Sequence, residues 1–246
     1  MIGRFLEFSV VTPDIRASLE FYDRLGFSEA EVGEAWAHPY AVLTDGRICL
    51  GLHQEPTFAS STTFVRPNLL RHVDRLEESG LELEFRRLGN DVFNEIGWLD
   101  PSGHLIRLLE ARTFSPGKRS TIHTSMCGYF IEIALPSPNV ETAKRHWERI
   151  GFVGMDEPDA VLPHVSCTSD TVDVGLYDPA HLREPTLLFE VANFSESVAR
   201  LREAGFTPNL NLPAPLRHAD AAMLTAPEGT FILLGGPGSW SSATAL

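Results

Sequence analysis

Two glutamates stand at equivalent places inside segments that have the composition of β-strands. Glu7 lies within "FLEFSVV" and Glu132 lies within "FIEIAL". Alternate residues of a strand point to opposite faces of a sheet. We therefore expect Phe5, Glu7 and Ser9 to share one face, with Glu7 directed into a cleft. A carboxylate in a cleft could ligate a metal or act as a general base, and the structural alternative is a partly solvated side chain on the cleft floor.

Three further residues could take part in the same chemistry. His53 lies in the alternation of a predicted strand and could ligate a metal or transfer protons. Arg107, in "LIRLL", is always protonated, and its guanidinium can hold a carboxylate or carbonyl group through two parallel hydrogen bonds. Trp98 precedes "LDPSG" and could stack on an apolar ligand. The structural alternatives are a surface histidine, an ion pair between Arg107 and Glu7, and core packing of Trp98.

The chain contains an internal repeat that places both glutamates in register. With an offset of 125, "FLEFSVVTPDIRASLEFYDRLGF" and "FIEIALPSPNVETAKRHWERIGF" align without a gap. Later blocks keep the same order, including "DPSGHLIRLL" and "APEGTFILLG". A repeat of this kind indicates two similar halves. The residues identical in the first pair of segments are Phe5, Glu7, Pro13, Arg24, Gly26 and Phe27, which recur as Phe130, Glu132, Pro138, Arg149, Gly151 and Phe152.

Each half divides again into a strand, a helix and several short strands. The first helix is predicted to be capped by Thr12 and to begin at Pro13. Because one helix serves several strands, the pattern predicts an α+β fold of four βαβββ modules rather than a parallel doubly wound sheet. The predicted organisation is a first domain over 1–110 (modules 1–56 and 57–110), a linker over 111–128, a second domain over 129–237 (modules 129–183 and 184–237) and a loosely docked tail over 238–246.

Composition excludes several classes of partner. The net charge of −13 and the lack of a basic patch argue against binding to nucleic acid or to a membrane surface. The chain has no signal-peptide pattern and no apolar run that could span a bilayer, so we expect a cytoplasmic protein. Cys49, Cys127 and Cys167 are odd in number and form no CxxC pair, so neither a disulfide framework nor a thiolate zinc site is indicated.

The four modules, the "VVTPDIRASLEFYDRLGF" strand-to-helix entry and the "WLDPSGHLIRLLE" ending resemble the vicinal oxygen chelate superfamily of glyoxalases, bleomycin resistance proteins and extradiol dioxygenases. The resemblance implies two tandem glyoxalase-like domains, each with a curved mixed sheet around a cleft. It also implies metal ligands, usually His and Glu, on the first and last strands of the modules. The corresponding positions here are Glu7, Ser61 or Thr62, and Arg107 in the first half, and Glu132, Thr186 and Leu233 in the second.

These substitutions lead to three functional hypotheses. The leading one is a small-molecule binding protein of the drug-sequestering kind. This hypothesis predicts no cofactor and an Arg107 guanidinium that balances the charge of Glu7. Its ligand-binding residues would be Glu7, Arg107, His53, Trp98 and Glu132. The second is a lyase or extradiol-type dioxygenase in which Glu7 and His53 hold a divalent ion (Zn, Ni, Mn or Fe). The third makes the second half a degenerate scaffold for dimerisation, and either a monomer or a homodimer is expected.

Overall fold

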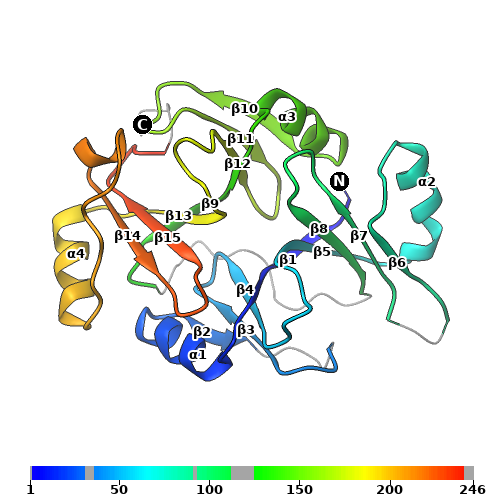
Figure 1. Ribbon diagram of the computed structural model, residues 1–246, viewed down its shortest axis with the longest axis horizontal. Helices are drawn as coiled ribbons and strands as arrows, with labels where there is room; N and C mark the ends of the chain where they lie inside the picture. The colour runs from blue at the N-terminus through cyan, green and yellow to red at the C-terminus, as the bar shows by residue number, and fades with distance from the viewer. Residues whose placement is uncertain (1, 31–35, 91–92, 112–124, 241–246) are drawn as a thin grey trace.

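The computed structural model describes every residue except 1, 31–35, 91–92, 112–124 and 241–246. Two mixed β-sheets carry helices α1 to α4, which confirms the predicted α+β class (Figure 1). Most of the predicted linker, residues 112–124, lies outside the described residues. No described helix is both long enough and apolar enough to span a membrane.

The first sheet comes from the first half and has the strand order β2-β3-β4-β1-β5-β8-β7-β6. Strands β1, β5 and β8 lie at its centre, with β1 antiparallel to β5 and β5 parallel to β8. Its elements are β1 (Arg4–Val11), α1 (Ile15–Arg24), β2 (Ser28–Ala30), β3 (Tyr40–Thr44), β4 (Cys49–His53), β5 (Ser61–Arg66), the short 3₁₀ turn η1 (Leu69–Arg71), α2 (Val73–Glu78), β6 (Phe85–Arg87), β7 (Glu95–Leu99) and β8 (Leu105–Glu110).

The second sheet repeats this arrangement in the order β10-β11-β12-β9-β13-β15-β14. Its last module has one strand fewer, and a single bridge between Asn209 and Met223 stands where the missing strand would pair. Its elements are β9 (Tyr129–Pro136), α3 (Val140–Arg149), β10 (Val153–Glu157), β11 (His164–Thr168), β12 (Val174–Tyr177), β13 (Thr186–Glu190), α4 (Phe194–Glu203), the 3₁₀ turn η2 (Leu216–His218), β14 (Ala221–Thr225) and β15 (Phe231–Gly235).

A β-bulge in β1 changes the alternation that the sequence predicted. Phe5 pairs with Phe64 and Glu7 pairs with Thr63, so the register shifts between Phe5 and Glu7. An extra residue at a bulge changes which face the following side chains occupy. Phe5 therefore joins the apolar core with Phe8, while Glu7 and Ser9 lie on the opposite face. The prediction that Phe5 shares a face with Glu7 was wrong.

The first helix begins two residues later than the sequence predicted. Asp14, rather than Thr12, is the N-cap, and its carboxylate accepts hydrogen bonds from the backbone N–H groups of Arg16 and Ala17. Thr12 is buried and bonds to the Ser18 hydroxyl instead. Short polar side chains cap helices because they accept from the otherwise unpaired N–H groups of the first turn.

One hydrophobic core is common to both halves. The same cluster contains Phe64 and Ile106 from the first sheet and Ile133 and Phe189 from the second. The segment before each half's first strand also bonds to the other half's helix: Ile2 N–H donates to the Ile150 carbonyl at 3.0 Å, and Met126 N–H donates to the Leu25 carbonyl at 2.7 Å.

Aromatic side chains on the helices repeat this reciprocal contact. In Figure 1, α1 lies beside the turn between β14 and β15, and α3 lies beside the turn between β7 and β8. Tyr22 on α1 donates to Glu228 at 2.7 Å, and Trp147 on α3 donates to Asp100 at 3.4 Å. Tyr22 and Trp147 are related by the repeat offset of 125. The two halves are therefore packed together by equivalent contacts.

The start of the predicted tail is firmly packed, which corrects the expectation of loose docking. Trp240 is buried at 2% exposure, and its indole N–H donates to the Phe189 carbonyl at 2.9 Å. Its ring lies against Gly235, where an added Cβ would overlap it. Trp240 belongs to a second apolar cluster, which also contains Leu188 and Leu233.

Replacing Trp240 with alanine should therefore destabilise the protein strongly. The change removes a buried aromatic ring and a buried hydrogen bond, which together cost about 3–5 kcal/mol. Urea denaturation followed by circular dichroism would measure the loss, with Leu210→Ala, an exposed apolar site, as the control. A loss below about 1 kcal/mol would contradict the packing described for the tail.

Candidate functional site

Glu7 is completely buried and is bound by three side chains of the first half. The Ser9 hydroxyl donates to its Oε1 at 2.8 Å, and the Tyr40 hydroxyl donates a short hydrogen bond to its Oε2. His53 Nε2 lies 3.1 Å from Oε1. Gly51 provides the space, because a Cβ there would overlap the carboxylate. Burial and the neighbouring carboxylate keep Tyr40 protonated by raising the pKa of its phenol well above the usual value.

The hydrogen bonds continue from this carboxylate in two directions. Ser9 bonds to Thr63 at 2.8 Å, and Thr63 bonds to Ser61 at 3.1 Å. His53 Nδ1 lies 2.9 Å from His38 Nε2. If His53 donates from Nε2 to Glu7 and accepts at Nδ1 from His38, neutral rings satisfy every one of these contacts. The predicted ligand His53 is thus a fully buried partner of Glu7.

Arg107 lies on β8 but does not pair with Glu7. Its guanidinium lies over the rings of Phe58 at 4.2 Å and Phe85 at 4.9 Å, and its NH1 is 3.7 Å from Glu95 Oε2. It makes no hydrogen bond to any residue that the structure describes, and its Nε is buried without a partner. The predicted Glu7–Arg107 ion pair was therefore wrong, because Glu95 on the neighbouring strand β7 is the acid nearest to this arginine.

The positive charge of the buried Arg107 is only partly compensated by neighbouring acids. The side chain is 8% exposed. Loss of solvent lowers the pKa of Arg107, and the charge of Glu95 opposes that shift only in part. Glu95 also pairs with Arg87 at 3.2 Å, so one carboxylate is shared between two cations. The buried Nε donor of this guanidinium has no acceptor among the described residues, and a buried donor without an acceptor is costly.

The second half has an equivalent cluster around Glu132. Tyr177 donates to Glu132 Oε1 at 2.6 Å, Ser166 donates to Oε2 at 2.8 Å, and His164 Nε2 lies 3.2 Å from Oε1. The sequence predicted neither a partner for Glu132 nor a site role for His164. The four side chains compensate one another, which explains how Glu132 can be buried at 1% exposure.

His164 is a charged partner of Glu132. Its Nδ1 donates to the Leu162 carbonyl at 2.8 Å, so Nε2 needs a second proton to bond to the carboxylate. Burial acts to lower the pKa of His164, but the hydrogen bond and charge of Glu132, helped by the Leu162 carbonyl, outweigh it and raise that pKa. The imidazolium and carboxylate therefore form a buried ion pair.

Tyrosine and histidine exchange places between the two halves. In the first half, Tyr40 on β3 is the cross-strand partner of His53 on β4. In the second, His164 on β11 is the partner of Tyr177 on β12. Tyr40 aligns with His164 and His53 aligns with Tyr177, both with an offset of 124. This reciprocal exchange is a sequence signal that could have identified both clusters.

The residues at the superfamily's metal positions do not supply a metal-binding donor set. Thr63 on β5 pairs with Glu7 on β1 and with Arg107 on β8. The position between Glu7 and Arg107 is therefore filled by Thr63 rather than by Ser61 or Thr62. The second half places Leu188 between Glu132 and Leu233. A divalent ion needs three or four donors, and an arginine would repel it. Within the described residues, no three His, Cys, Asp or Glu side chains are grouped to hold a metal.

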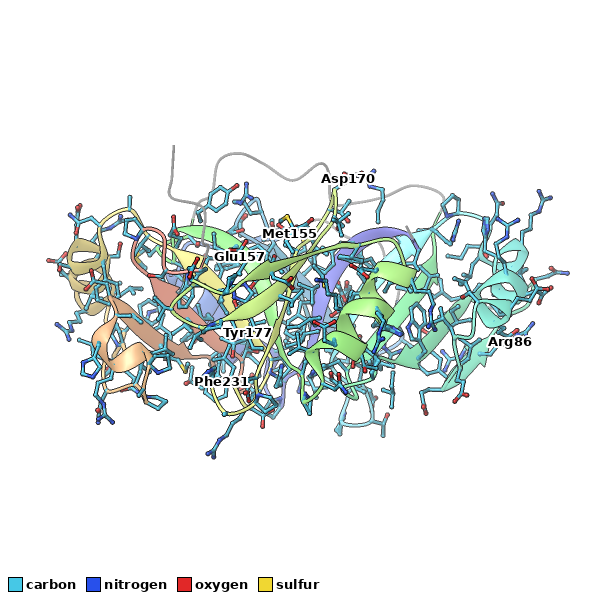
Figure 2. All side chains as sticks on the ribbon, turned by 90° about the horizontal axis from the view of Figure 1, so that it is seen from above. Arg86, Met155, Glu157, Asp170, Tyr177 and Phe231 are labelled. Carbon is cyan, nitrogen blue, oxygen red and sulfur yellow. The ribbon has the colours of Figure 1, made fainter. Side chains whose placement is uncertain are left out.

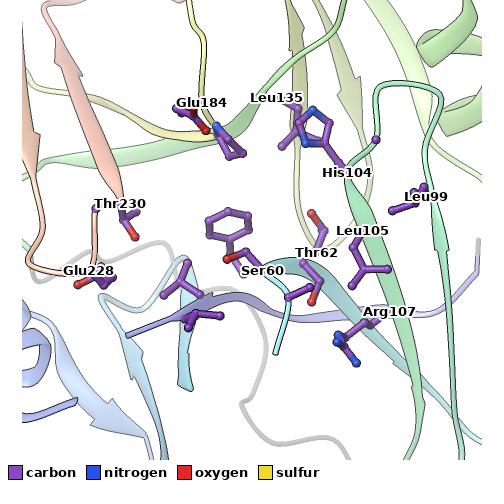
Figure 3. Close-up of a pocket in the computed structure, with 18 of the residues that line it drawn as sticks. Ser60, Thr62, Leu99, His104, Leu105, Arg107, Leu135, Glu184, Glu228 and Thr230 are labelled. Atoms are coloured by element: carbon purple, nitrogen blue, oxygen red, sulfur yellow. The ribbon is translucent and has the colours of Figure 1, made fainter. Parts of the chain in front are cut away.

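A pocket of about 770 Å³ lies where the two halves meet (Figure 3). Arg107 contributes from the first half, and His104 comes from the turn before β8. Glu184 and Glu228 come from the second half. The apolar lining residues include Phe8, Val10, Phe85, Leu99, Leu105, Leu135 and Pro185. The pocket was not predicted from the sequence, because it depends on how the halves pack.

Trp98 and Glu132 do not line this pocket. Trp98 is fully buried in the shared core, where its indole N–H donates to His146 at 3.2 Å. Glu132 and its partner Tyr177 are buried in the second half. Figure 2 shows Tyr177 far from Arg86, which lies at the outer end of the first half. Of the five residues proposed to bind a ligand, Arg107 alone is among the residues that line the pocket.

Solved structures with the same architecture are extradiol dioxygenases. A catechol 2,3-dioxygenase is 13% identical with a TM-score of 0.61, covering 100% of this chain and 96% of its own. The 2,3-dioxygenase LapB from Pseudomonas sp. KL28 is 14% identical with a TM-score of 0.64, covering 100% and 98%. The E323L mutant of homoprotocatechuate 2,3-dioxygenase from Brevibacterium fuscum is 17% identical with a TM-score of 0.62, covering 98% and 73%.

The fold is thus shared with these extradiol dioxygenases, as the sequence motifs indicated. No family model and no curated protein matches the sequence. Likeness at this level of identity establishes the architecture, while chemistry depends on the residues of the site.

The ion pair of His164 should make stability depend on pH. Because its pKa in the folded protein is raised above the value of about 6.5 for an unperturbed histidine, its contribution is complete below about pH 6.5 and is lost as the pH rises through the raised pKa. Between about pH 6 and pH 9, the free energy of unfolding should fall more for the wild type than for His164→Gln. His181→Gln, a histidine outside the cluster, should retain the wild-type slope. Equal slopes in the wild type and His164→Gln would refute the assignment.

Proposed function

We propose that the protein binds a small organic molecule carrying a carboxylate or carbonyl group, with Arg107 as the anchor. The observation behind the proposal is the buried side chain of Arg107, which is 8% exposed, lines the pocket and makes no hydrogen bond to the described residues. A ligand oxygen could take the place of the missing acceptors. Two parallel charge-assisted hydrogen bonds from one guanidinium would fix both the position and the orientation of such a group.

Burying Arg107 without a close partner costs free energy. A buried cation needs a close partner to offset its loss of hydration. The 3.7 Å distance from Arg107 NH1 to Glu95 Oε2 is long for an ion pair, and Glu95 also pairs with Arg87. The faces of Phe58 and Phe85 stabilise the cation but accept no conventional hydrogen bond. An unmet hydrogen-bonding demand of this kind is a recurrent feature of binding sites.

The pocket has the size and lining expected for a small ligand. Its volume of about 770 Å³ falls within the range of about 300–1,000 Å³ that is common for such sites. Apolar residues cover much of its wall, and a few polar groups supply direction. Because Leu135, Glu184 and Glu228 come from the second half, that half contributes to the proposed site and is more than a scaffold for dimerisation.

A second candidate is a metal-dependent lyase or extradiol-type dioxygenase that uses Glu7 and His53. The dioxygenase architecture of the similar structures favours it, and Glu7 Oε1 and His53 Nε2 are close enough, at 3.1 Å, to bind one ion. Against it, both oxygens of Glu7 already accept hydrogen bonds, and Arg107 stands at the last-strand ligand position. We therefore place the first candidate ahead of the second.

Arg107→Met tests the leading candidate in two ways. We expect the free energy of unfolding of the unliganded variant to equal or exceed that of the wild type, because a buried and poorly paired cation is replaced by an apolar side chain. Titration calorimetry with a panel of aromatic and aliphatic carboxylates should find binding to the wild type that weakens at least about tenfold in Arg107→Met. Arg87→Met, at an exposed partner of the same acid, should keep the affinity. A loss of stability above about 2 kcal/mol, without any effect on carboxylate binding, would make Arg107 structural.

Metal titration tests the second candidate. Protein stripped with a chelator would be titrated with Zn(II), Ni(II), Mn(II) and, without oxygen, Fe(II). Because the donor set is incomplete, we expect no tight stoichiometric binding. One tightly bound ion per chain, lost in Glu7→Gln but kept in the equivalent Glu132→Gln, would establish the metal-dependent candidate and displace the leading one.

A further inference from the structure

Glu228 is a second polar group of the pocket, and it is held in place from the other half of the molecule. Its Oε1 accepts from the Tyr22 hydroxyl at 2.7 Å, and its Oε2 accepts from the Ser18 hydroxyl at 2.8 Å. Ser18 in turn bonds to Thr12 at 2.9 Å. Tyr22, Ser18 and Thr12 are all buried, whereas Glu228 is only partly buried. A partly exposed acid is therefore oriented by a rigid and buried set of donors.

The two hydrogen bonds leave Glu228 able to accept more. A carboxylate has about four lone-pair sites, and two are used here. Burial, followed by the charge of Glu228, raises the pKa of Tyr22 well above its usual value, so the phenol remains a donor to the carboxylate. The remaining lone pairs belong to a side chain that lines the pocket. They can accept from a ligand.

Glu228 and Arg107 lie at separate parts of the pocket. Figure 3 shows Glu228 and Thr230 on one side and Arg107 on the other, with Ser60 and Thr62 between them. Apolar groups such as Phe8, Val10 and Leu135 also line the pocket. The pocket therefore presents an anion and a cation at separate parts of a space that both polar and apolar groups line.

We propose that the ligand is amphoteric: it carries a carboxylate that binds Arg107 and an amine that binds Glu228, joined by an apolar body. The inference rests on the proposed function and adds the amine to it. An ammonium group is a donor of matching charge for the preoriented Glu228 carboxylate. Further acids, Glu84 and Glu184, lie at the exposed rim and would attract the same group.

The competing role for Glu228 is a purely structural clamp between the halves. Its bonds to Tyr22 and Ser18 join the β14–β15 turn to α1, and a clamp would need no ligand. A clamp predicts that Glu228→Gln alters stability and affects every ligand equally. A binding role predicts a loss confined to ligands that carry the amine.

Matched aromatic probes separate these roles. Titration calorimetry would use para-methylbenzoate, para-methylbenzylamine and para-(aminomethyl)benzoate, and the same three substitution patterns on biphenyl to vary the separation of the charges. On at least one scaffold, we expect the probe with both groups to bind the wild type at least about tenfold more tightly than the probe with the acid alone. Glu228→Gln should remove this advantage and leave the affinity for the acid alone unchanged. Glu196→Gln, at an exposed acid outside the pocket, should retain it.

Each outcome has a distinct consequence. If the added amine brings no advantage on either scaffold, or if Glu228→Gln weakens all probes equally, the amphoteric ligand is refuted while the proposed function stands. If no acid-bearing probe binds the wild type, both are refuted. Thermal melting would check that Glu228→Gln is folded, and Glu228→Asp, which keeps the charge but shortens its reach, gives a second comparison and should lose part of the advantage.

Discussion

Burial of a carboxylate beside a β-sheet requires donors close to both of its oxygens, and this requirement shapes the interior of each half. An unpaired buried anion would cost several kcal/mol. Glu7 and Glu132 meet the requirement with a serine, a tyrosine and a histidine each. A glycine on the adjacent strand, Gly51 in one half, makes room for the carboxylate. The protein's own side chains thus supply the donors that each buried carboxylate needs.

Arg107 is the contrasting case. Glu7 is satisfied by neighbouring side chains, whereas Arg107 is also buried but lacks hydrogen bonds to the described residues. Glu7 belongs to a closed internal network, whereas the buried Nε of Arg107 lacks an acceptor among the described residues. The first half thus combines a well-paired carboxylate with a group suited to recognition. This difference, more than the fold, favours ligand binding.

Features set by periodicity along the chain were predictable from the sequence, whereas features set by pairing between strands were not. The repeat and the four modules belong to the first kind. The predicted partner of Arg107 was wrong, because only the strand order brings Glu95 on β7 beside β8. The bulge between Phe5 and Glu7 places Phe5 on the core face of the sheet, opposite to the face predicted. His164 was missed because it lies on β11 and contacts Glu132 on β9, two strands away in the sheet. The alignment of Tyr40 with His164 was the sequence signal that could have identified it.

The two halves have diverged in the residues that lie over their glutamates. In the second, Leu188 and Leu233 fill the positions beside Glu132, and Trp240 packs with them in one apolar cluster. In the first, the corresponding positions are Thr63 and Arg107, both polar. An apolar filling stabilises the second half through burial, while the polar residues of the first add little to stability unless they are paired. Because the shared core holds the halves together, the second half can stabilise the proposed site, whose proposed anchor Arg107 belongs to the first.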